Sequence, residues 1–218
     1  MSKAANPEVE ALEVGTGQGG FGGEDFYPEG GWGSALPATP QHAYLTGILM
    51  GVLAIGMFFL ALTSAFIVRK GSGGDWQSFA LPRILWLNTA VLIASSFTLA
   101  RARRRLLNGY ESEFRRWWHI TTVLGIAFLA GQLVAWRELA HAGLYLASNP
   151  SSSFFYLLTG AHGLHLLGGV CAFFYVAWLG TKAGTTRRVE TASRITAVYW
   201  HFLDGLWVFV LLLLLLGR

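Results

Sequence analysis

Four ionisable residues lie where the chain is otherwise strongly apolar, and they are its candidates for chemistry. His162 and His165 fall in one apolar run, and His201 and Asp204 fall in the next. Each pair is spaced three residues apart, so on a helix both members face the same side. Ionisable groups at such depth are costly and usually face a bundle interior or a functional path.

Several kinds of chemistry are open to this set. Three imidazoles and a carboxylate could bind zinc or iron, His165 and His201 could ligate a haem, and the group could handle protons. The compact metal motif with two histidines one turn apart beside a glutamate is absent. Glycines around His162 favour a helix contact too close for a porphyrin. The favoured interpretation is therefore a buried polar lock between helices, with no catalytic, cofactor or metal site in this chain.

Depth arithmetic predicts the partners within that lock. At 1.5 Å per residue, His165 and Asp204 both lie roughly 13–14 Å from the same membrane edge. We therefore expect Asp204 to pair with His165, and His201 is the second candidate. Further interhelical polar contacts are expected from Asn88, Gln132 and Trp200.

Composition indicates which elements position these side chains. Mean hydropathy is +0.46 and only 13% of residues are charged, which is typical of a membrane protein rather than a soluble domain. Five segments are long enough to cross a hydrocarbon core, which takes roughly 20 apolar residues. They are Tyr44–Val68, Leu81–Ala100, Trp117–Trp136, Phe154–Gly180 and Ile195–Leu216. The predicted fold is an all-α membrane bundle of five transmembrane helices.

Loop charges predict how the bundle is oriented. The connections after the second and fourth segments are rich in arginine, whereas the stretch 140–153 has no lysine or arginine. The positive-inside rule places the basic connections in the cytoplasm. The amino terminus is then cytoplasmic and the carboxyl terminus outside.

The first part of the chain differs from the rest. Residues 1–41 are rich in glycine and acidic residues, with scattered aromatics. This composition predicts a tail that is disordered or that docks on a partner, followed by a membrane domain at 42–218.

The order of motifs resembles subunit III of the haem-copper respiratory oxidases, the cytochrome c oxidase and quinol oxidase family. The resemblance runs from about Tyr44 to Gly217. It is carried by Pro82…Leu87-Asn88-Thr89…Ser95-Ser96, Gln132…Trp136…Glu138, Phe154-Phe155…Thr159-Gly160-Ala161-His162-Gly163-Leu164-His165 and Tyr199-Trp200-His201-Phe202-Leu203-Asp204…Trp207. The five-span length is similar to the short bacterial form, which lacks the two leading helices of the seven-helix form.

The resemblance implies an accessory subunit without redox centres in a bacterial cytoplasmic (inner) membrane. It would pack beside the catalytic subunit I, which holds haem and copper, bind structural phospholipid, and support proton uptake and stability. The equivalent subunit of a nitric oxide reductase and a stand-alone transporter are the alternatives. The family typically carries a buried glutamate in the first of these helices. Its place falls near Ile55, and no acid occurs from Tyr44 to Val68.

Overall fold

Helices connected by turns make up the described part of the chain. The computed structural model describes residues 41–72, 74, 76, 81–183 and 187–217, and these contain no strand. The helices are α1 (Gln41–Ser72), α2 (Ile84–Leu107), α3 (Glu111–His141), α4 (Pro150–Ala183) and α5 (Arg187–Leu216). All five are long and apolar enough to cross a membrane, which confirms the predicted fold class. Its orientation stays a prediction, and residues 1–40 of the predicted tail lie outside the described residues.

Most helices extend beyond the segments that hydropathy marks. α3 begins at Glu111 and α4 at Pro150, several residues before the apolar runs. Hydropathy marks only the apolar part of each helix, which lies in the hydrocarbon core. The backbone hydrogen bonds of the helix continue into the polar residues on either side. After α2 and α3 the chain turns at Gly109 (φ 78°) and Gly143 (φ 77°). Glycine adopts this left-handed conformation without the penalty of a Cβ.

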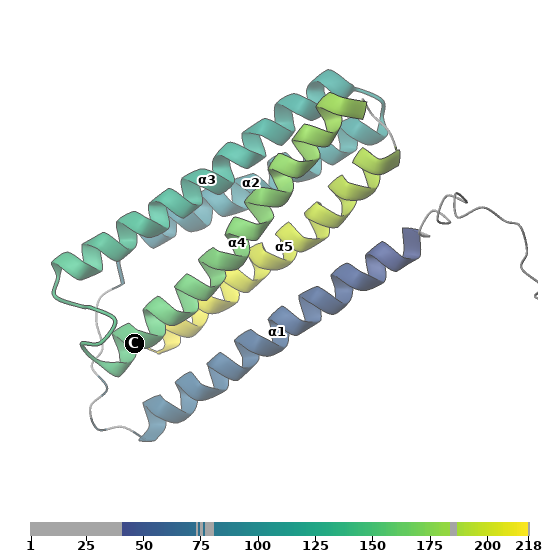
Figure 1. Cartoon of the computed structure of the whole chain (residues 1–218). Helices are drawn as coiled ribbons and strands as arrows, with labels where there is room; N and C mark the ends of the chain where they lie inside the picture. The colour runs from purple at the N-terminus through teal and green to yellow at the C-terminus, as the bar shows by residue number, and fades with distance from the viewer. Residues whose placement is uncertain (1–40, 73, 75, 77–80, 184–186, 218) are drawn as a thin grey trace, which may run out of the picture. The chain divides into compact units, whose positions relative to one another are not determined.

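The helices form a bundle to which α1 is attached at one side. α2 packs along α3 and also contacts α5, while α4 contacts both α3 and α5. Among the described helices, α1 contacts only α4 and α5, and Figure 1 shows it separated from α2 and α3. α4 and α5 are therefore the helices that join α1 to the rest of the bundle.

Trp200 of α5 is the central packing residue. Its side chain is fully buried, and its Nε1–H donates a hydrogen bond to Ser95 Oγ of α2 at 2.9 Å. A Cβ added at Gly125 of α3 would lie 2.7 Å from the indole, and one added at Gly169 of α4 would lie 2.9 Å from it. The two glycines thus give the ring its space, because small residues let membrane helices approach closely.

The end of α1 is fastened to the carboxyl end of the chain. Lys70 Nζ donates to the carbonyl oxygen of Leu216 at 2.9 Å, and Trp76 Nε1 donates to that of Gly217 at 3.1 Å. The Phe66 and Trp76 rings pack edge to face with centroids 5.2 Å apart. These contacts compensate for the small interface that α1 makes along its length.

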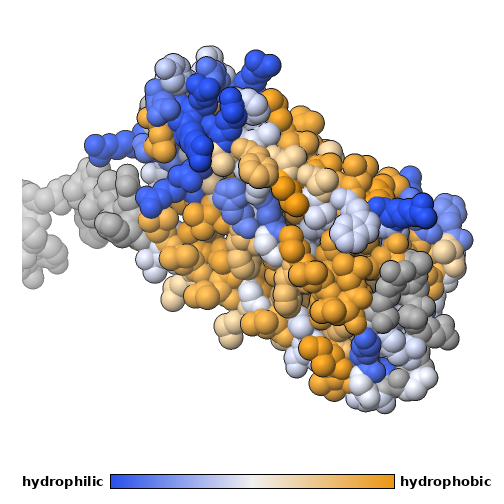
Figure 2. Space-filling model, turned by 180° about the vertical axis from the view of Figure 1, so that it is seen from behind, coloured by the Kyte–Doolittle hydropathy of each residue, from blue (hydrophilic) through white to orange (hydrophobic). Residues whose placement is uncertain are grey.

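Hydrophilic residues gather toward the two ends of the molecule, and apolar residues cover much of the middle (Figure 2). At the α2–α3 turn, Arg105 Nε lies 3.0 Å from Glu113 Oε2. Arg101 stacks 4.8 Å from the Trp117 ring centroid, a geometry that a cation and an indole favour. The folded structure thus holds both arginine side chains in place.

Candidate functional site

Asp204 and His201 meet Ser96 at the contact of α5 with α2. The Ser96 hydroxyl donates a hydrogen bond to Asp204 Oδ2, and Ser96 Oγ lies 2.9 Å from His201 Nδ1. The direct separation of His201 Nδ1 and Asp204 Oδ2 is 4.0 Å. Ser96 therefore connects the two ionisable residues, which are one helical turn apart.

With Asp204 ionised, the hydrogens available fix the direction of this chain of hydrogen bonds. A hydroxyl has one proton to donate, and that of Ser96 points to Asp204. His201 Nδ1 must then carry a hydrogen and donate it to Ser96 Oγ. We call this arrangement, from His201 through Ser96 to Asp204, the α2–α5 relay. It can orient an imidazole and a carboxyl group, and its Asp204 Oδ1 has no hydrogen-bond partner among the described residues.

His165 is placed elsewhere, which corrects the predicted pairing. Its Nδ1 lies 2.7 Å from the carbonyl oxygen of Ala161 in its own helix. Its ring faces α1, with centroids 6.2 Å from Phe58 and 5.8 Å from Phe59. Asp204 has Ser96 and His201 as its neighbours instead. Equal depth did not bring His165 and Asp204 together, because α4 turns His165 toward α1.

His162 lies inside the bundle, apart from the relay. It is fully buried, with ring centroids 5.8 Å from Phe128 and 5.1 Å from Trp207. Neither ring nitrogen has a hydrogen-bond partner within the described ranges. The proposed four-residue lock is thus distributed over three places, and only His201 and Asp204 share one.

Interhelical polar contacts were expected from Asn88, Gln132 and Trp200, and among these only Trp200 donates a hydrogen bond to a described side chain of another helix. Trp200 donates to Ser95, as described above. Gln132 is buried, and neither of its amide atoms has a partner among the described residues. Asn88 lies against α3, where its amide would overlap a Cβ added at Gly131. Asn88 Nδ2 also has no partner within the described part.

Indole groups make polar contacts that sequence reasoning did not single out. Trp207 of α5 donates to Thr89 Oγ1 of α2 at 3.0 Å, seven residues after the similar Trp200 contact. Trp118 of α3 donates to the carbonyl oxygen of Phe173 in α4 at 3.0 Å. The sequence contained a signal for these bonds. Trp200 and Trp207 are seven residues apart in one apolar segment, and the hydroxyl residues Thr89 and Ser95 are similarly spaced in another.

No group of three or more histidine, cysteine, aspartate and glutamate side chains that could hold a metal ion occurs among the described residues. The relay provides one imidazole and one carboxyl group, and His162 and His165 face other neighbours. The arrangement is therefore suited to hydrogen bonding and to positioning.

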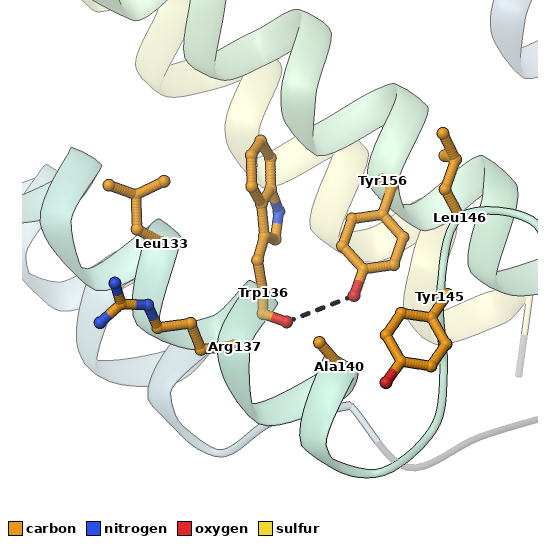
Figure 3. A pocket seen from close by; sticks show the side chains of 7 residues that line it. All are labelled: Leu133, Trp136, Arg137, Ala140, Tyr145, Leu146 and Tyr156. Carbon is orange, nitrogen blue, oxygen red and sulfur yellow. Dashed lines mark hydrogen bonds between the residues drawn. The ribbon is translucent and has the colours of Figure 1, made fainter.

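A separate pocket of about 390 Å³ lies where α3 ends. Figure 3 shows Leu133 and Arg137 of α3 on one side and Tyr145 of the α3–α4 connection on the other. Between them, Tyr156 Oη donates to the carbonyl oxygen of Trp136 at 3.3 Å. The pocket combines an exposed guanidinium group with aromatic and aliphatic walls.

Comparison with known proteins identifies the family. The model of the family described as cytochrome c oxidase subunit III matches residues 25–216. The chain belongs to the cytochrome c oxidase subunit III family. A probable cytochrome c oxidase subunit 3 of Nocardia farcinica is 36% identical over 156 residues, covering 70% of this chain and 77% of the relative. Cytochrome c oxidase subunit 3 of a Synechocystis strain is 30% identical over 175 residues, covering 78% and 74%. That of Thermostichus vulcanus is 27% identical over 190 residues, covering 84% and 93%.

Family membership confirms the resemblance based on the motifs and makes this chain a haem-copper oxidase subunit. α1 contains no acidic residue. Ile55, near the place expected for the glutamate of subunit III, is partly buried against the core. An aliphatic side chain thus occupies that region of this member of the family.

Proposed function

We propose that this chain is the non-redox accessory subunit of a bacterial haem-copper terminal oxidase in the cytoplasmic membrane. It packs beside the catalytic subunit, binds phospholipid, and supports proton uptake and stability during turnover. The family match over residues 25–216 carries the proposal. The relatives are named as cytochrome c oxidase subunits, which favours this function over a nitric oxide reductase subunit or a transporter.

The pocket at the end of α3 supports the lipid-binding part. Arg137 can pair with a lipid phosphate, because guanidinium groups form strong charge-assisted hydrogen bonds with phosphate oxygens. Tyr145 and Tyr156 suit the headgroup level, where aromatic residues gather in membrane proteins. Leu133, 57% exposed, provides an apolar wall along which an acyl chain can lie.

The arginine-rich end supports the proton-uptake part. Arg101 and Arg105 are held at the α2–α3 turn by Trp117 and Glu113. Fixed charges of this kind shape the local field and attract anionic lipid. At the cytoplasmic surface they would influence how quickly protons reach a neighbouring catalytic subunit.

Selective removal of this chain from the purified oxidase tests the functional proposal. We expect the remaining subunits to keep their haem spectra and initial activity, and then to inactivate progressively during turnover. The loss should be faster at alkaline pH, where proton supply is slowest, and adding the chain back should reverse it. If the depleted enzyme turns over as fast and as long as the intact one across the pH range, support of the catalytic subunit is disproved.

The lipid-binding part has its own test. Arg137→Gln should reduce the anionic phospholipid that co-purifies with the complex, as measured by native mass spectrometry. Arg83→Gln is the matched control, because Arg83 is an exposed arginine that precedes α2 at the same end of the bundle. Equal lipid retention by both variants and the unmodified complex would remove Arg137 from the proposal.

A further inference from the structure

The α2–α5 relay joins an exposed ionisable group to a buried one. The His201 side chain is 43% exposed and that of Asp204 is 13% exposed. Their Nδ1 and Oδ2 atoms are 4.0 Å apart, which is too far for a direct hydrogen bond. Ser96 Oγ hydrogen-bonds to both. A hydroxyl group accepts as well as donates, so it can receive a proton from one neighbour while it gives its own to the other.

The surroundings of Asp204 make Ser96 its connection to other polar groups. Asp204 Oδ1 is buried without a hydrogen-bond partner among the described residues, and Oδ2 accepts from Ser96. The groove of about 260 Å³ beside Asp204 is lined mainly by aliphatic and aromatic side chains, such as Ile93, Phe97 and Val208. These three side chains have no proton to exchange. The hydrogen-bonded route to Asp204 therefore passes through Ser96.

Arg103 extends the relay toward the arginine-rich end of α2. It lies seven residues after Ser96, which is about two turns, so both residues are on the same face of the helix. Arg103 is partly buried, and its charge acts on the His201 imidazole. Glu190 and Arg194 of α5 in turn act on Arg103. Charged side chains within a membrane draw water toward them, so this is the side from which water can reach His201.

Histidines on the other helices face elsewhere. His165 of α4 faces α1, and His162 packs inside the bundle. His119 of α3 lines a pocket against α4, and His141 is the last residue of α3. Residues 45–68 of α1 contain no acidic, basic or histidine residue. Arg103 is thus the described charged group that acts on the relay.

We propose that the α2–α5 relay is a proton-binding site, in which a proton that arrives at His201 is stored on Asp204. With Asp204 ionised, His201 carries its hydrogen on Nδ1, and its Nε2 has a free lone pair. A proton from water binds to Nε2. The Nδ1 hydrogen then moves to Ser96 Oγ while the Ser96 hydrogen moves to Asp204 Oδ2. His201 is again neutral, with its hydrogen on Nε2, and Asp204 is a neutral acid. The step takes place within this chain and is independent of the proposed function.

The stored proton removes a charge from the apolar part of α5. That part begins at Ile195, so Asp204 lies roughly 14 Å inside it at 1.5 Å per residue. A carboxylate at such depth is costly, whereas a protonated carboxyl group is neutral. Storage also reverses both hydrogen bonds, because Asp204 then donates to Ser96 and Ser96 donates to His201 Nδ1. The direction of these bonds thus records whether a proton is bound.

A pH titration of the full chain in lipid nanodiscs tests the storage. Infrared spectroscopy detects the C=O band of a protonated aspartate, and nitrogen NMR distinguishes histidine with hydrogen on Nδ1, on Nε2 or on both. Asp204→Asn and His201→Gln identify the two signals. As the pH is lowered, the Asp204 band should appear and the His201 hydrogen should move from Nδ1 to Nε2 at one common midpoint. Separate midpoints, a doubly protonated His201 beside an ionised Asp204, or no change of either group while the chain stays folded would overturn the proposal.

Two substitutions at position 96 test the hydroxyl group. Ser96→Ala leaves His201 Nδ1 and Asp204 Oδ2 at 4.0 Å without a group that connects them, so the common midpoint should be lost. Ser96→Thr keeps a hydroxyl group at this position and should retain the common midpoint. Circular dichroism checks that both variants are folded. A common midpoint in Ser96→Ala, or its loss in Ser96→Thr, would contradict proton transfer through Ser96.

Hydrogen–deuterium exchange tests the entry through His201. At a pH where Asp204 is protonated, transfer to D₂O shifts its C=O band as deuterium replaces the proton. His201→Phe removes the imidazole that accepts the incoming proton, so this shift should become several-fold slower. His165→Phe is the matched control, because His165 faces α1 and lies outside the relay. An unchanged rate in His201→Phe, or equal slowing in both variants, would show that protons do not enter through His201.

Discussion

Enlarging Gly125 by one methyl group tests whether Trp200 is held as tightly as the structure indicates. In Gly125→Ala the new Cβ would lie 2.7 Å from Trp200 Cη2 and 3.3 Å from Val170 Cγ2. Carbon atoms pack best at about 3.5–4.0 Å, so the ring would have to move by about 1 Å. It has little room, because Gly169 lies against its other edge and Ser95 holds its Nε1.

The magnitude follows from two opposing effects. Overpacking a close-fitted core costs about 1–3 kcal/mol, whereas alanine in a helix interior is favoured over glycine by up to about 1 kcal/mol. Gly51→Ala gains the second effect without the first, because nothing lies within 4 Å of its Cβ. We therefore expect the free energy of unfolding of Gly125→Ala to be about 1–3 kcal/mol below that of Gly51→Ala.

Unfolding of the detergent-solubilised chain, followed by circular dichroism, measures this difference. The double variant Gly125→Ala with Trp200→Phe provides a further check, because the smaller ring leaves space for the methyl group. The two substitutions should be less destabilising together than the sum of their separate effects. Equal stability of the two alanine variants, or strict additivity in the double variant, would refute the tight packing of Trp200.

Three further predictions concern two buried polar contacts and the absence of redox centres. In a double-mutant cycle on the free energy of unfolding, Ser96→Ala and Asp204→Ala should show a coupling energy of about 0.6–1.7 kcal/mol. The effects of Asp204→Ala and His165→Ala should instead be additive. Coupling between Asp204 and His165 alone would show that the pairing expected from depth is correct. Trp207→Phe removes the hydrogen bond to Thr89 and should lower the free energy of unfolding by about 0.5–1.5 kcal/mol. An unchanged free energy of unfolding would contradict a stabilising role for that bond. The chain purified free of partners should show no Soret band in its optical spectrum and no stoichiometric metal in elemental analysis; either one would contradict an accessory role without redox centres.

The helices were predictable from sequence because lipid imposes a simple rule on composition. A segment that crosses the hydrocarbon core must be apolar and must pair its own backbone groups. Their ends were not predictable in the same way. The turn before α4 depends on local bonds, such as Ser152 N–H donating to Asn149 Oδ1 at 2.9 Å. The α2–α3 turn depends on the left-handed Gly109.

The site was predictable in its residues but not in its pairing. Sequence indicated that Asp204 needs a partner at mid-depth, and Ser96 was among the polar residues of the second segment. Helical rise gives the height of His165 but not the direction in which α4 turns it. That direction is set by packing against Phe58 and Phe59 of α1, which involves a third helix far away in sequence. Pairing of side chains in a bundle depends on rotation as well as depth.

The bonds that fasten α1 to the carboxyl end constrain the order of biogenesis. Lys70 and its acceptor Leu216 are 146 residues apart, a stretch that takes a ribosome roughly 7–30 s at about 5–20 residues per second. The acceptor carbonyls of Leu216 and Gly217 are thus synthesised long after α1. Until α5 has been synthesised, α1 lacks these two bonds and its packing against α5, and among the described helices only α4 can contact it. During that interval, an insertion factor or chaperone has access to the faces of α1 that α4 and α5 later cover.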